Sequence, residues 1–105
     1  MTQRELLQHI KERLQNLYGS RFRGLVLYGS MARGDAGEDS DIDLLCLLDG
    51  PVDVTKEVLI ISHETYPLQL EYLDRVFHIM VADESNYSTG GSPLCIEVEK
   101  EGVAV

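Results

Sequence analysis

The chain has 105 residues, 44% of them apolar and 26% charged, so we expect one globular domain over residues 1–105. Nine basic against 18 acidic side chains give a net charge of −9, which argues against direct binding of a nucleic-acid backbone. No apolar run approaches the roughly 18 residues of a membrane span, and the N-terminal sequence lacks a signal-peptide core, so we expect a cytoplasmic protein with no membrane contact.

The first half of the sequence predicts one helix and two strands. Apolar residues at helical spacing indicate a helix over residues 3–18. Residues 22–28 are typical of a short strand, and residues 31–40 begin with good helix formers and finish as a polar loop. Residues 41–48 become almost entirely apolar after the first three positions, which favours an inner strand covered on both faces.

The second half predicts a long helix and then a third strand. Apolar residues from Asp53 onward follow helical spacing, and Pro67 should kink or end that helix near Tyr66. Residues 75–82 are typical of a strand, and residues 83–89 of a short helical or irregular passage.

The C-terminal part predicts one more helix. Ser92 is a suitable N-cap with proline following it, and Gly102 is a suitable stop. Residues 103–105 are β-like. The complete order of elements predicts an α/β (α+β) domain, a small sheet flanked by helices.

The turn after the first strand is suited to phosphate. Gly29 and Ser30 stand between a strand and a predicted helix start, where free backbone N–H groups and the positive end of a helix dipole attract anions. Glycine lets a phosphate approach the backbone closely, and the serine hydroxyl adds a donor.

Two aspartates alternate at the start of the second strand. The two-residue period puts Asp41 and Asp43 on one face of the strand and Ile42 on the other. Neighbouring carboxylates repel each other unless a cation lies between them, and Mg²⁺ favours such oxygen ligands together with substrate phosphates. A phosphate cradle beside an aspartate pair is the apparatus of phosphoryl or nucleotidyl transfer.

At these residues the chain resembles a known family. Gly29-Ser30, ten further residues and Asp41-x-Asp43 match the GS-x10-DxD signature of the polymerase-β-like nucleotidyltransferases. The fuller stretch GSMARGDAGEDSDIDLL resembles the minimal nucleotidyltransferases (MNT proteins), which are often encoded beside a HEPN-domain protein. The resemblance covers nearly the whole chain and is strongest over residues 24–48.

The resemblance implies a fold, a substrate and a partner. The fold would be the nucleotidyltransferase fold with a small mixed sheet. Gly29 and Ser30 would hold the phosphates of ATP or another nucleoside triphosphate, and Asp41 and Asp43 would bind Mg²⁺ or Mn²⁺. Arg33 would either assist with phosphate or fix the acidic loop that follows it. Some MNT proteins transfer AMP to a tyrosine of a HEPN toxin and so act as antitoxins.

One position departs from the family pattern. Alignment of the third strand places His78 where the family has a third carboxylate. Imidazole is a poor Mg²⁺ ligand and a better one for Mn²⁺ or Zn²⁺, although it could serve as a base near neutral pH. A histidine at a strand edge with no catalytic role is equally consistent with the sequence.

The sequence therefore leaves two main functions open. One is an active nucleotidyltransferase, most simply a protein adenylyltransferase, with Asp41, Asp43 and His78 in the catalytic site. The other is an impaired MNT domain that neutralises a HEPN partner by contact alone. A nucleotidyltransferase acting on a small molecule is a weaker alternative, and the oligomeric state, including a homo-oligomer, stays open.

Overall fold

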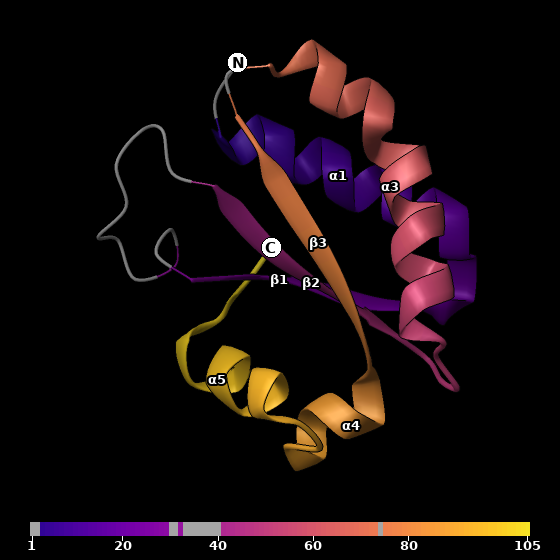
Figure 1. The fold of residues 1–105 in the computed structure, drawn as a ribbon, viewed down its shortest axis with the longest axis vertical. Coiled ribbons are helices and arrows are strands. Elements are labelled where there is room, and N and C mark those ends of the chain that lie inside the picture. Colours follow the sequence, from indigo (N-terminus) through magenta and orange to yellow (C-terminus); the bar gives the residue numbers. More distant parts are fainter. Residues whose placement is uncertain (1–2, 30–31, 33–40, 74) are drawn as a thin grey trace.

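The computed structural model describes residues 3–29, 32, 41–73 and 75–105. Its helical elements are α1 (Gln3–Tyr18), the 3-10 turn η1 (Gly19–Arg21), α3 (Val54–Glu71), α4 (Glu84–Thr89) and α5 (Pro93–Glu101). Its strands are β1 (Phe22–Tyr28), β2 (Ile42–Leu48), β3 (Phe77–Asp83) and β4 (Val103–Ala104). Figure 1 follows these elements along the chain. The predicted helix after Gly29-Ser30 falls outside the described residues, apart from Ala32.

The strands form one mixed sheet in the order β3-β2-β1-β4. β1 runs antiparallel to both β2 and β4, whereas β2 and β3 are parallel and joined through α3. The inner position of β2 explains its nearly continuous apolar sequence, because both of its faces are covered. The expected small mixed sheet flanked by helices is confirmed.

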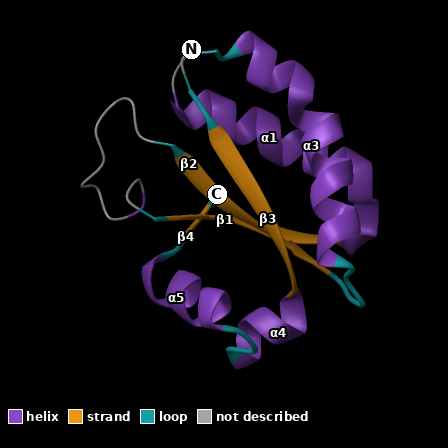
Figure 2. Ribbon diagram, viewed as in Figure 1, coloured by secondary structure: helices purple, strands orange, loops and turns teal. Residues whose placement is uncertain are grey.

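Helices cover both faces of the sheet (Figure 2), with α1 and α3 on one side and α4 and α5 on the other. On β2 the side chains of Ile42, Leu44, Cys46 and Leu48 join the core under α1 and α3. The alternate side chains Leu45 and Leu47 join a second core that includes Cys95 and Val98 of α5. This alternation decides on which face each polar side chain of β2 lies.

Of the two outcomes expected at Pro67, a kink or an end near Tyr66, the end is wrong, because α3 continues through Pro67 to Glu71. Proline inside a helix costs about 3 kcal/mol through a lost hydrogen bond and a steric clash. Pro67 lies on the exposed side of α3, however, whereas Leu68 and Tyr72 are buried in the core. Burial of large apolar side chains contributes about 1.5–3 kcal/mol each, which offsets the proline.

The remaining predicted elements are found with shifts of one or two residues. Ser92 caps α5 by accepting a hydrogen bond from the Cys95 backbone N–H, and Pro93 begins the helix. Residues 84–89 form the short helix α4, and the β-like tail becomes β4 against β1. Among the described residues, no helix has the length and apolar character needed to cross a membrane.

Candidate active site

The aspartate pair lies at the start of β2, on the face covered by α5. Ile42 is fully buried in the core under α1 and α3, so its neighbours in the alternation face the other way. Asp43 is partly buried, and the side chain of Asp41 is 55% exposed. The expectation that Asp41 and Asp43 share one strand face agrees with this arrangement.

Gly29 lies directly against Asp43. Its φ of +75° belongs to the left-handed region that favours glycine, and a Cβ atom added there would be 2.7 Å from Asp43 Oδ2. The Gly29 carbonyl accepts a hydrogen bond of 3.1 Å from the Ala32 N–H, which closes the turn after β1. The antiparallel pairing of β1 with β2 creates this contact, because it places Tyr28 opposite Asp43. Only glycine allows the aspartate to approach the turn so closely.

His78 joins the site from β3. The parallel register pairs His78 with Asp43, so both side chains project from the same face of the sheet. His78 Nε2 lies 3.1 Å from Asp41 Oδ2, and both side chains are more than half exposed. When Nε2 carries a proton, His78 can donate a hydrogen bond to the Asp41 carboxylate. The contact is an ion pair only when the imidazole is protonated on both nitrogens. The structure brings His78 to the aspartate pair, whereas its role stays a prediction.

Tyr28 also borders the site, and the sequence reasoning did not single it out. Burial, then the negative charges of Asp43 and Glu97, raise the pKa of the Tyr28 phenol above its ordinary value. The phenol therefore stays protonated at neutral pH and can donate a hydrogen bond. No sequence signal placed Tyr28 beside Asp43, because that neighbourhood depends on the register between β1 and β2.

Two of the predicted phosphate-binding residues, Ser30 and Arg33, lie outside the described residues. Of the predicted site residues, the structure therefore brings together Gly29, Asp41, Asp43 and His78. Binding and catalytic roles for all six remain predictions.

The two carboxylates fit a divalent cation that is bound partly by the protein and partly by a substrate. Asp41 and Asp43 supply hard carboxylate oxygens, which suit Mg²⁺ or Mn²⁺. No three side chains of the His, Cys, Asp and Glu types come close enough within the described part of the chain to hold a metal ion by themselves. Mg²⁺ usually keeps one or two protein carboxylates and fills its other positions with water and substrate phosphates. A two-carboxylate site agrees with that preference.

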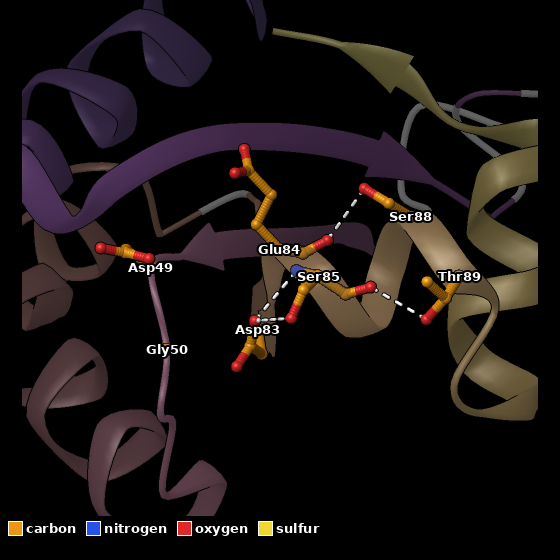
Figure 3. Close-up of a pocket in the computed structure, with 7 residues that line it drawn as sticks. All are labelled: Asp49, Gly50, Asp83, Glu84, Ser85, Ser88 and Thr89. Carbon is orange, nitrogen blue, oxygen red and sulfur yellow. Dashed lines mark hydrogen bonds between the residues drawn. The ribbon is translucent and has the colours of Figure 1, made fainter.

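A second group of acidic side chains lies at the other end of the sheet (Figure 3). There a cavity of about 480 Å³ is lined by Asp49, Gly50, Asp83, Glu84, Ser85, Ser88 and Thr89. Asp83 is already engaged, since its Oδ1 accepts hydrogen bonds of 2.9 and 2.8 Å from the Ser85 backbone N–H and hydroxyl. These bonds lower the pKa of Asp83. The turn that borders this cavity also contains a glycine, Gly50, between β2 and the start of α3, but Asp83 is held by Ser85 and is less available to a ligand.

A mixed sheet that presents a strand–glycine turn and two alternating aspartates on one face defines a protein of the nucleotidyltransferase class. The family model of the nucleotidyltransferase domain matches residues 7–102. The chain therefore belongs to the nucleotidyltransferase domain family.

Solved structures show the same fold. A candidate nucleotidyltransferase from Sulfolobus solfataricus superimposes with a TM-score of 0.67 at 20% identity, over 95% of this chain and 76% of that chain. A toxin–antitoxin structure containing AMP-PNP gives a TM-score of 0.62 at 18% identity, over 92% of this chain and 70% of that chain. A variant of the MntA–HpeT toxin–antitoxin gives 0.57 at 21% identity, over 93% and 70%. The chain thus has the nucleotidyltransferase fold that these structures share.

A curated relative is also similar in sequence. A candidate protein adenylyltransferase of Methanocaldococcus jannaschii is 38% identical over 53 residues, which are 50% of this chain and 51% of that protein. The match thus spans about half the length of the relative.

Proposed function

We propose that this chain is a protein adenylyltransferase, which transfers AMP from ATP to a hydroxyl of a HEPN-type toxin and thereby acts as its antitoxin. The hydroxyl oxygen would form the new bond to the α-phosphorus, the bond from that phosphorus to the α,β-bridging oxygen would break, and pyrophosphate would leave. Membership of the nucleotidyltransferase family supports the reaction class. The name of the archaeal relative supports protein as the acceptor, and the toxin–antitoxin neighbours support the kind of partner. The observation that carries the proposal is the position of Asp41 and Asp43 on one sheet face beside the Gly29 turn.

Each described site residue has a task in this proposal. Asp41 and Asp43 would hold Mg²⁺ or Mn²⁺, which would neutralise phosphate charge when bound. The Gly29 turn, with Ser30 after it, would receive the phosphates of ATP. The Asp41 and His78 side chains are more than half exposed, so a protein acceptor can approach them directly.

The test follows the α-phosphate and the γ-phosphate of ATP separately. The chain is incubated with Mg²⁺, the protein encoded beside it, and ATP labelled at either the α- or the γ-phosphate. We expect the α-label on the partner protein and no γ-label, with a mass increase of one AMP. The double variant Asp41→Asn/Asp43→Asn should transfer neither. Transfer of the γ-label, or α-label transfer by the double variant, would contradict adenylyl transfer at this site.

His78 supports a second candidate, a toxin-binding module with little or no catalysis. His78 is paired with Asp43 in the sheet and contacts Asp41, at the point where the family has a third carboxylate. If a third hard ligand limits the reaction, transfer by the natural chain should be slow or should require Mn²⁺. His78→Asp should then raise Mg²⁺-dependent transfer, with His78→Ala as the control that removes the imidazole without adding a carboxylate.

The two candidates give different results in that experiment. An increase with His78→Asp supports an enzyme short of one ligand. A decrease with both His78→Asp and His78→Ala indicates that the imidazole serves as the base. Toxin neutralisation that persists unchanged in Asp41→Asn/Asp43→Asn, with no transfer by any variant, would favour the binding module.

A further inference from the structure

The side chain of Tyr28 lies in one row with Asp43 and His78 across the sheet. Tyr28 is paired with Asp43 in the register of β1 and β2, and Asp43 is paired with His78 in the register of β2 and β3. Side chains paired in this way project from the same face, on strands about 4.8 Å apart. Tyr28 is therefore the immediate neighbour of a proposed metal ligand, on the strand that leads into the Gly29 turn.

The C-terminal end of α5 lies beside the same part of β1. Gly102 ends α5 and leads into β4, which pairs with β1 at Val26 and Leu27 (Figure 2). A Cβ atom added to Gly102 would be 2.5 Å from Val26 Cγ1, so the end of the helix packs directly on β1. Val26 precedes Tyr28 by two residues and shares its strand face. The end of α5 thus borders the row of polar side chains on the side of Tyr28.

This border carries negative charge. Of the last five residues of α5, three are glutamates and one is a lysine. The carbonyl end of the helix dipole adds partial negative charge at the same place. The charges of Asp43 and Glu97 both act on the Tyr28 phenol and, after burial, are the causes that raise its pKa. The Tyr28 hydroxyl is therefore a protonated group within electrostatic reach of one carboxylate on β2 and another on α5.

These charges decide which part of a nucleotide can lie beside α5. Carboxylates repel phosphate groups, so the triphosphate would lie toward the Gly29 turn and the cation at the aspartate pair. An ionised carboxylate only accepts hydrogen bonds, whereas a phenol can donate one. Ribose hydroxyls suit this combination, because each can donate to a carboxylate and accept from a phenol. The ribose is also bonded directly to the α-phosphate, so it is the part of the nucleoside nearest to the cation.

We propose that Tyr28 and Glu97 form a ribose subsite, in which Glu97 accepts a hydrogen bond from a ribose hydroxyl and Tyr28 donates one to the same sugar. The substrate is then a ribonucleoside triphosphate, because a deoxynucleotide would leave the Glu97 carboxylate without its donor. This inference rests on the proposed function, since the nucleotide is the ligand. It makes Tyr28 and Glu97 specificity-determining residues that act on the sugar.

The test measures calorimetric binding to the full chain, in the presence of Mg²⁺ or Mn²⁺, of a non-hydrolysable ATP analogue and its 2′-deoxy and 3′-deoxy forms. We expect the loss of one hydroxyl to weaken binding by about tenfold or more, because a hydrogen bond to a charged group has a net effect of this size. The double variant Tyr28→Phe/Glu97→Ala should bind the ATP analogue and that deoxy form with similar affinity. The ratio of the two affinities is compared, so a general effect of charge on triphosphate binding cancels.

Tyr87→Phe/Glu99→Ala is the matched control. It also removes one phenol hydroxyl and one carboxylate of α5, and Tyr87 packs partly buried against the same core as Tyr28. This variant should keep the preference of the natural chain for the ribose form. Circular dichroism confirms that both double variants are folded.

The outcomes separate the ribose subsite from the proposed function. Equal binding of all three analogues by the natural chain would overturn the subsite and leave the proposed function intact. A preference that Tyr28→Phe/Glu97→Ala retains, or that both double variants lose, would do the same. If the natural chain binds none of the analogues with either metal, both the subsite and the proposed function are overturned.

Discussion

Single residues decide whether Asp43 can lie against the turn after β1. Gly29 has a φ of +75°, and a Cβ atom there would meet Asp43 Oδ2 at 2.7 Å. Gly29→Ala should lower the free energy of unfolding by about 1–2 kcal/mol through backbone strain and should also displace the carboxylate. We therefore expect metal-dependent ATP binding to weaken by about tenfold or more, because small misplacements of catalytic groups have effects of this size.

Gly19 provides the matched control for this prediction. Its φ is +57°, but nothing lies within 4 Å of a Cβ atom added to it. Gly19→Ala should cost about 1 kcal/mol in stability and leave ATP binding unchanged. Calorimetric titration of both variants with Mg²⁺ and ATP separates strain from displacement. Equal binding by the two variants would show that the contact between Gly29 and Asp43 has no part in the site.

Cys46 and Tyr18 should make the free energy of unfolding decrease at alkaline pH. Burial, then the negative charge of Glu57, raise the pKa of the Cys46 thiol from 9.0 to about 12. The same two causes raise the pKa of the Tyr18 phenol from 10.0 to about 12. Both folded pKa values exceed the unfolded ones, so the stabilising effect is complete below pH 9 and is lost as pH rises toward 12.

We expect the urea midpoint to fall between pH 9 and pH 10, where Cys46 ionises in the unfolded chain alone. The free energy of unfolding should fall by no more than about 1.4 kcal/mol per pH unit, because only one group is responsible. Cys46→Ala should remove this decline below pH 10, and Cys95→Ala, which also replaces a buried cysteine, should retain it. A decline unchanged by Cys46→Ala would contradict the assignment.

At the scale of elements, α3 shows how packing overrides local sequence. Pro67 lies within the helix and is exposed, while Leu68 in the next position is buried. Pro67→Ala should restore a backbone donor and stabilise the chain by about 1–2 kcal/mol, less than the full cost of proline because proline also restricts the unfolded chain. Urea unfolding measures the change. A loss of stability would mean that the core side of α3 depends on the shape that proline imposes.

Periodicity and local signals predicted most helices and strands, but not which residues of different elements come into contact. Alternation alone placed Asp41 and Asp43 on one face of β2, because a strand has a fixed period of two. The contact of Asp43 with Gly29, and the presence of Tyr28 beside it, required the pairing of β1 with β2. Likewise the extension of α3 beyond Pro67 depended on the burial of Leu68 and Tyr72, which are tertiary effects.

At the scale of the whole molecule, the two faces of the sheet carry different chemistry. The face toward α5 presents Asp43 and His78, while the opposite face is covered by α1 and α3. The acidic cavity at Asp49 and Asp83 lies at the far end of the same sheet. These separations allow each surface to be altered without the others, which makes a direct test of the nucleotide site feasible.

The most direct measurement is calorimetric binding of a non-hydrolysable ATP analogue, with and without Mg²⁺ or Mn²⁺. It needs no acceptor protein. We predict that binding requires the divalent cation and is lost in Asp41→Asn/Asp43→Asn, because in the proposed site those carboxylates would hold the cation that bridges to the phosphates. Asp49→Asn/Asp83→Asn removes the same charge from the other acidic cavity and should bind as the natural chain does. Binding that survives in Asp41→Asn/Asp43→Asn but disappears in Asp49→Asn/Asp83→Asn would contradict the proposed nucleotide site.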